Sequence, residues 1–224
     1  MTQPLELSAH GRRRRTQALC ALPALLAAAA CAAQTAAPDL PEGPFAYPAS
    51  LLAARSTYTV SPATPVLLGS TVVVLEQSRL GDVAAIVRAP VHVEGSGEDA
   101  RRWVCAEADD AGRPLKLWFI SSSGETVTEV QMRPGSFSGD ARCGRLSAHF
   151  EPVYLSRIAS GMKLEAVVRD IGPASAHDAQ GWNFWVSRRT YDYYGQSFTE
   201  YVWVGARVSD EGVVGDVFTA QITR

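Results

Sequence analysis

The chain has 224 residues, a formal net charge of −2, a pI near 6.1 and a 46% share of hydrophobic residues. Its only dense basic cluster, Arg12 to Arg15, lies near the N-terminus, so the charge pattern gives no reason to expect a nucleic-acid partner. The length suits one or two compact domains with a sizeable core. No stretch beyond the N-terminal region is apolar for long enough to cross a membrane.

Residues 1–31 have the form of an export signal. The basic cluster is followed by an Ala- and Leu-rich run from Ala18 to Ala33, shorter than the roughly 20 residues of a membrane span. Three alanines precede Cys31, which resembles a bacterial lipobox, in which the cysteine is acylated and becomes the new N-terminus. Ordinary cleavage after a small-x-small site and an incidental cysteine are the alternatives. We predict a protein held on the periplasmic face of the outer membrane through Cys31, or otherwise periplasmic or secreted.

Residues 32–65 are predicted to be a flexible linker. This stretch is rich in Pro, Ala, Ser and Thr, and such a composition buries too little surface to order itself. A segment of about 30 residues has a root-mean-square reach near 30 Å. That reach suits a spacer that holds a folded domain away from a bilayer.

Residues 66–150 are predicted to form a β-rich domain. Short runs rich in Val, Ile, Trp, Phe and Thr alternate with Gly- and Pro-containing turns. The expected strands are Val66 to Glu76, Val83 to Val93, Arg102 to Ala108, Leu115 to Ile120, Thr126 to Met132 and Gly144 to Phe150. Several have two apolar faces, which indicates a small sandwich or half-barrel.

The cysteine count predicts a disulfide in this domain. Cys105 and Cys143 are the only cysteines beyond the leader and its Cys31, and an even pair in an oxidising compartment typically forms a bridge. It would close a loop of about 40 residues and stabilise the fold by roughly 2 to 4 kcal/mol. The alternative is a pair of reduced, buried thiols.

Residues 151–224 follow a different pattern. A short helical turn is expected from Tyr154 to Ser160, and a helix after Met162, in which apolar residues recur at i, i+3, i+4 and i+7 before a Gly-Pro stop. Three strand-like runs follow: Trp182 to Ser187, Phe198 to Ser209 and Val213 to Thr223. The predicted fold class is therefore α+β, a β-rich half followed by a helix-helix-three-stranded antiparallel domain.

This region resembles the SmpA/OmlA, or BamE-like, domain. The shared series is a hydrophobic residue, Gly-Met, a short amphipathic helix and a Gly near a Pro, represented here by Ile158, Gly161, Met162, Val167, Ile171, Gly172 and Pro173. The match covers about 70 residues. Lys163 and Ala166 replace the Ser/Thr and Glu/Gln of the family's capping box, so that box is lost. An unrelated α+β module with the same amphipathic pattern is the alternative.

The resemblance implies a non-catalytic scaffold of the bacterial outer membrane that binds envelope proteins and needs no cofactor. The β-rich half is not part of the type member of that family. A secreted inhibitor is a further alternative, because a known inhibitor of β-lactamases has a similar domain. We expect no enzyme activity.

Candidate chemistry is sparse. His92 with Glu94, and His149 with Glu151, have the spacing of side chains that share one strand face. If their strands were neighbours, the four could bind zinc or copper in a periplasmic metal protein or enzyme; the simpler interpretation is solvated strand faces. We predict no metal site.

Aromatic residues near the C-terminus are the candidate partner interface. At period two, Tyr201 and Trp203 share one strand face and Val202 and Val204 share the other. Either that aromatic pair or the loop pair Tyr193 and Tyr194 is expected to contact an envelope protein. Burial beneath the N-terminal half is the alternative.

Overall fold

The computed structural model describes residues 43–58, 65–97, 100–122, 124–135, 139 and 142–224, all within one compact unit that spans Asp39–Arg224. The leader, Cys31 and the linker residues 32–42 and 59–64 lie outside the described residues. Within the described part, no helix is both long and apolar enough to cross a bilayer.

The fold is mostly β. In its N-terminal part the elements are a 3-10 helix η1 (Ala49–Ala53), β1 (Val66–Leu68), β2 (Thr71–Val73), α1 (Leu80–Val87), β3 (His92–Glu94), β4 (Arg101–Asp110), β5 (Arg113–Ser121) and β6 (Glu129–Pro134). The rest comprises β7 (Gly144–Arg145), a 3-10 helix η3 (Ala148–Phe150), β8 (Val153–Tyr154), α2 (Leu164–Ile171), β9 (Ala176–His177), β10 (Trp182–Tyr193), β11 (Gln196–Val208) and β12 (Val214–Thr223).

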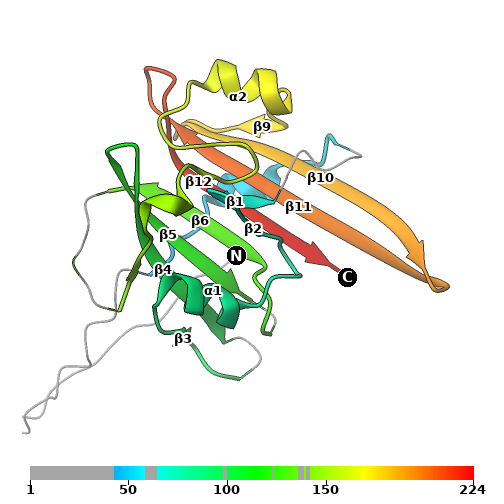
Figure 1. The fold of residues 1–224 in the computed structure, drawn as a ribbon. Coiled ribbons are helices and arrows are strands. Elements are labelled where there is room, and N and C mark those ends of the chain that lie inside the picture. The colour runs from blue at the N-terminus through cyan, green and yellow to red at the C-terminus, as the bar shows by residue number, and fades with distance from the viewer. Residues whose placement is uncertain (1–42, 59–64, 98–99, 123, 136–138, 140–141) are drawn as a thin grey trace, which may run out of the picture. The chain divides into compact units, whose positions relative to one another are not determined.

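One large sheet organises these elements. Its order is β3-β4-β5-β6-β12-β11-β10-β9, with β7 paired in parallel to β4, and a small sheet β2-β1-β8 lies apart from it. The central join is the antiparallel pairing of β12 with β6, in which Ala220 lies opposite Glu129. Figure 1 shows the resulting continuous surface, with the β10–β11 hairpin extending past the end of β12.

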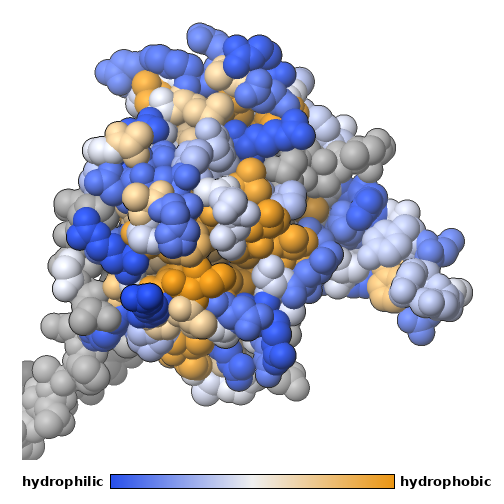
Figure 2. All heavy atoms as spheres, in the orientation of Figure 1, coloured by the Kyte–Doolittle hydropathy of each residue, from blue (hydrophilic) through white to orange (hydrophobic). Residues whose placement is uncertain are grey.

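One face of the large sheet carries the main core. Side chains such as Phe119, Val130, Trp185, Val204 and Val217 are fully buried there against α1, α2 and the small sheet. Figure 1 shows the two helices at opposite ends of the sheet, α1 against β4 and β5 and α2 close to β9. Figure 2 shows that hydrophobic residues reach the surface mainly in the middle of the face that is turned to the viewer.

Helix α1 stands where the sequence predicts the start of a strand, Val83 to Val93, so that prediction is wrong. Leu80, Val83 and Val87 recur at helical spacing and are buried together against the sheet. Glu125 supports the first turn, because its carbonyl accepts the Leu80 N–H at 2.7 Å. Only the last two residues of the predicted run, His92 and Val93, lie in a strand, β3.

The predicted fold class is also wrong. The three C-terminal strands exist, but β12 continues the sheet of the N-terminal half, so no separate helix-helix-three-stranded domain begins at residue 151. The expected helical turn at Tyr154 is instead strand β8, paired to β1. Hydrogen bonding explains this, since the edge of β1 needs a partner that a helix there would not supply.

Candidate functional site

Residues 43–58, here called the strap, cross the second face of the large sheet. They belong to the stretch that composition predicts to be a flexible linker, but the described part is anchored to the sheet. The Phe45 ring is buried beside Trp118 and Trp182, with ring centroids 6.1 and 6.0 Å away. Aromatic contacts of this kind stabilise a segment beyond its simple burial.

Hydrogen bonds fix the strap at both ends. The Phe45 N–H donates to Gln131 Oε1 at 2.8 Å, and Gln131 Nε2 donates back to the Phe45 carbonyl at 3.0 Å. At the other end, the Thr57 N–H donates to the Val186 carbonyl at 3.1 Å, so this part of the strap runs along the edge of β10. Between these anchors, Ser50 donates to Asp178.

Between the strap and the sheet lies an open apolar groove with a volume of about 550 Å³. We call it the strap groove. Its floor is formed by side chains of β10, β11 and β12, and its wall by Leu51, Leu52 and their neighbours on the strap. Leu52 is 93% exposed although it is a large apolar residue. A groove of this volume with mostly hydrophobic walls has the form of a small-molecule binding site.

Strand register orders the floor of the groove. One row of paired residues crosses four neighbouring strands: Val186 on β10, Trp203 on β11, Ala220 on β12 and Glu129 on β6. The groove therefore runs across the strands, with β10 at one end and β6 at the other. The two ends differ in charge.

The β6 end holds a buried carboxylate. Glu129 is 7% exposed, and its Oε1 accepts hydrogen bonds from Arg101 at 3.1 Å and from Gln131 at 2.6 Å. Burial raises the pKa of Glu129 above its ordinary value, and the positive charge of Arg101 opposes this shift. Burial, followed by the negative charge of Glu129, raises the pKa of the Tyr47 phenol well above its ordinary range. This end is polar, but its charges are already partnered.

Two arginine residues line the groove at the β10 end, Arg55 from the strap and Arg188 from β10. Both residues are exposed. Among the described residues neither has a carboxylate partner, and the Arg188 guanidinium lies 5.6 Å from the centre of the Tyr201 ring. The strap groove is therefore apolar in its middle and positively charged at this end.

The predicted aromatic residues separate into two places. Tyr201 and Trp203 are half-buried in the floor of the groove, stacked with ring centroids 5.8 Å apart, while Val202 and Val204 are buried on the opposite face. Tyr193 and Tyr194 lie far along the hairpin, at its turn, and are 60% and 90% exposed. The two pairs do not share a strand face. Arg188 lies opposite Tyr201, and alternation along β10 places Tyr193 on the other face, while Tyr194 lies in the turn.

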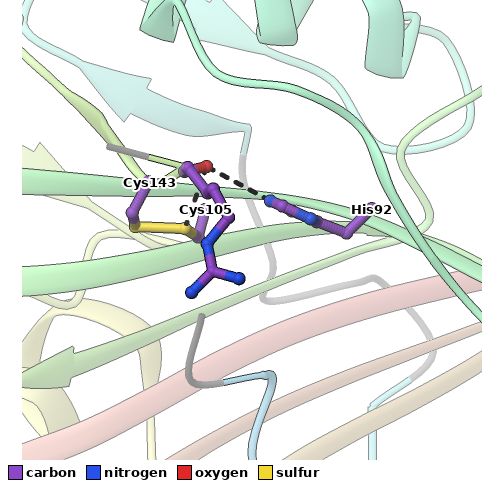
Figure 3. Close-up of a disulfide and its surroundings, with 4 residues drawn as sticks. His92, Cys105 and Cys143 are labelled. Atoms are coloured by element: carbon purple, nitrogen blue, oxygen red, sulfur yellow. Dashed lines mark hydrogen bonds between the residues drawn. A yellow bond between two sulfur atoms is a disulfide. The ribbon is translucent and has the colours of Figure 1, made fainter. Parts of the chain in front are cut away.

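The predicted disulfide between Cys105 and Cys143 is present, with 4.8 Å between the two Cα atoms. Strand pairing brings the cysteines together, because β7 aligns Gly144 with Ala106, one residue beyond each cysteine. Figure 3 shows His92 pointing toward this bridge, where its Nε2 lies 3.2 Å from the Arg142 carbonyl.

His92 and His149 have separate surroundings. The His92 ring packs against Trp103 at a tilt, whereas the His149 ring packs against Phe150 and lies 2.7 Å from the Ser147 hydroxyl. No group of three or more His, Cys, Asp or Glu side chains suited to a metal ion occurs in the described ranges. The structure thus offers no support for the alternative metal site.

The residues that resemble the BamE-like series have structural roles near α2. Ile158 and Val167 are buried in the main core, and Met162 and Ile171 pack against it. Gly161 and Gly172 have φ angles of +83° and +97°, and a Cβ at Gly172 would lie 2.8 Å from the Tyr58 hydroxyl. The lost capping box is compensated at the backbone, since the Leu164 N–H donates to the Gly212 carbonyl at 2.9 Å.

Sequence reasoning missed the strap and most of the groove. The aromatic residues Phe45 and Tyr47 were a signal of order in this segment, because flexible linkers contain few aromatic residues.

Comparison of the chain with protein-family models, with curated proteins and with solved structures gave no match.

Proposed function

We propose that this chain is a non-catalytic binding protein of the cell envelope that takes an apolar molecule into the strap groove. The observation that carries the proposal is the groove itself, a volume of about 550 Å³ with walls that are mostly apolar. Exposed apolar surface is costly to keep open to water, so a groove of this kind suits a function in binding. The polar groups at its two ends can orient what enters.

The envelope location is part of the same proposal. It rests on the leader-like residues 1–31 and on the Cys105–Cys143 disulfide, which is typical of an oxidising compartment. We propose that Cys31 carries a lipid that holds the protein at the outer membrane. Cys31→Ser should release the protein from the membrane fraction or leave it unprocessed. A wild-type mature protein that begins elsewhere and has no lipid mass would contradict the anchor.

Binding to the groove can be measured with a neutral fluorescent probe, N-phenyl-1-naphthylamine, added to the full chain. We expect its emission to rise on binding. Ala220→Leu places a larger side chain on the groove floor and should weaken the probe's affinity at least fivefold. Ala85→Leu, a matched change at an exposed position of α1, should leave it unchanged. Absence of probe binding to the wild-type protein would refute the proposed function.

A second candidate function, docking of an envelope protein, is favoured by the hairpin turn. Tyr193 and Tyr194 contact each other at 4.4 Å between ring centroids yet remain largely exposed. Aromatic residues in that state are common energetic anchors of protein interfaces. The double change to Ser should preserve the melting temperature and reduce recovery of crosslinked envelope proteins. Undiminished recovery would remove this candidate.

A further inference from the structure

We propose that the ligand of the strap groove is a single-chain fatty carboxylate, with its head group at Arg55 and Arg188 and its alkyl chain along the groove floor. This inference rests on the proposed function and adds to it the chemical class and the orientation of the ligand. Three observations carry it: the apolar middle of the groove, the cationic β10 end, and the neutralised β6 end.

The middle of the groove has the character that an alkyl chain needs. Trp203 and Ala220 face the groove from adjacent positions of β11 and β12, and Val186 flanks them on β10. Leu51 and Leu52 line the groove from the strap, at its side. A chain laid across the strands would thus meet apolar side chains from below and from one side. The free energy gained would increase with each methylene that leaves water.

The cationic end selects the sign of the head group. Arg188 follows Val186 on the same face of β10, one step beyond the apolar row, and Arg55 is carried to this end because the strap joins β10 at Thr57. Neither guanidinium has a carboxylate partner within the described ranges. Guanidinium groups bind carboxylates through paired, charge-assisted hydrogen bonds. A carboxylate placed here would therefore gain two new partners.

The β6 end disfavours the reverse orientation. An anionic head there would meet the Glu129 carboxyl, which already accepts hydrogen bonds from Arg101 and Gln131, and would gain no new cationic partner. A cationic head would approach Arg101, which already donates to Glu129 at 3.1 Å. A carboxylate at the β10 end with the chain directed toward β6 is consequently the arrangement that the charges favour. The groove volume of about 550 Å³ suits one chain in this arrangement, within the roughly 300–1,000 Å³ of ligand pockets.

The test is displacement of N-phenyl-1-naphthylamine from the full chain by amphiphiles of equal chain length, below their micelle concentrations. The affinity of tetradecanoate, obtained from displacement of the probe, should be at least tenfold higher than that of tetradecanol. The affinity of tetradecyltrimethylammonium should be lower than both. For carboxylates with ten to fourteen carbons, each added methylene should increase the affinity by a factor of at most about four, which is the gain expected from burying one methylene group.

Variants assign the head group to its site. Arg55→Gln with Arg188→Gln should lower the ratio of tetradecanoate affinity to tetradecanol affinity from at least tenfold to about one, with each affinity measured in the same variant. Arg169→Gln on α2 is a matched control, since this arginine is exposed and lies outside the groove, and it should change neither affinity. An undiminished preference for the carboxylate in the double variant would overturn the assignment.

The failures are distinguishable. If the neutral probe binds but the carboxylate shows no advantage over the alcohol, the present inference is wrong and the proposed function stands. If a lysophospholipid of the same chain length binds more tightly than the carboxylate, the proposed carboxylate head group is wrong. If the neutral probe does not bind at all, both fail together.

Discussion

Gln131 and Phe45 are joined by two reciprocal hydrogen bonds across 86 positions of sequence, so one amide side chain satisfies both backbone groups of the strap residue. Gln131 is fully buried. We expect Gln131→Leu to leave these groups without partners and to lower the free energy of unfolding by about 1–3 kcal/mol. Hydrogen exchange of the strap amides should accelerate more than that of β4 and β5. Gln180→Leu, at an exposed position, is the control. Equal protection of the strap in both variants would contradict the anchoring role.

Removal of the disulfide should destabilise the protein without changing its fold. The bridge spans 38 positions of sequence, and we expect Cys105→Ala with Cys143→Ala to lower the free energy of unfolding by about 2–4 kcal/mol. Denaturant titration of the oxidised wild type and the variant measures the difference. Peptide mapping without reductant should recover the two cysteines in one linked pair, and two free thiols after export would contradict it.

Stability and ligand binding should separate across strand β11. Val204 is fully buried in the main core, so Val204→Ala should lower the free energy of unfolding by about 1–3 kcal/mol and leave probe affinity intact in the folded fraction. Tyr201→Ala removes part of the groove floor and should weaken probe binding with a smaller loss of stability. Thermal melting and probe titration on the same samples test both. The reverse ranking would show that Tyr201 is a core residue.

Glu129 should make stability depend on pH. Burial raises the pKa of this carboxyl in the folded state above its ordinary value of 4.5, so the folded protein binds more protons than the unfolded chain between the two values. The stability contributed by Glu129 is thus complete below pH 4.5 and is lost as pH rises through the raised pKa. Glu129→Gln should remove this part of the dependence, measured by urea unfolding across pH 4 to 8 at about one-unit steps. An identical pH profile in wild type and variant would contradict the shift.

Local sequence patterns correctly predicted long central strands such as β5 and β11. The strand-like runs Leu115 to Ile120 and Phe198 to Ser209 correspond to β5 and β11, two central strands of the large sheet. The cysteine pair was also predicted correctly. These features depend on neighbouring residues or on a simple count, so the sequence alone contains the information needed.

Other features depend on partners that are distant in sequence. Val83 to Val93 favours a strand by composition, and the helix forms there because Leu80 and Val87 fill a space beside β4 and β5. Phe45 is held in place by contacts with Gln131 and Trp118, which are distant in the sequence. The strap groove likewise requires the register of four strands. None of these relationships is visible in a local pattern.

The pairing of β12 with β6 places the last strand of the chain in the middle of the large sheet. Strands β4 to β6 are complete by residue 134, yet one edge of β6 has no neighbour until Val214–Thr223 arrives. A chain that emerges from a translocation pore N-terminus first would expose that edge until its final residues cross. Unpaired edges promote association between chains. Completion of the large sheet therefore waits for β12, and a chain cut short before Val214 would leave two further edges open, on β6 and β11.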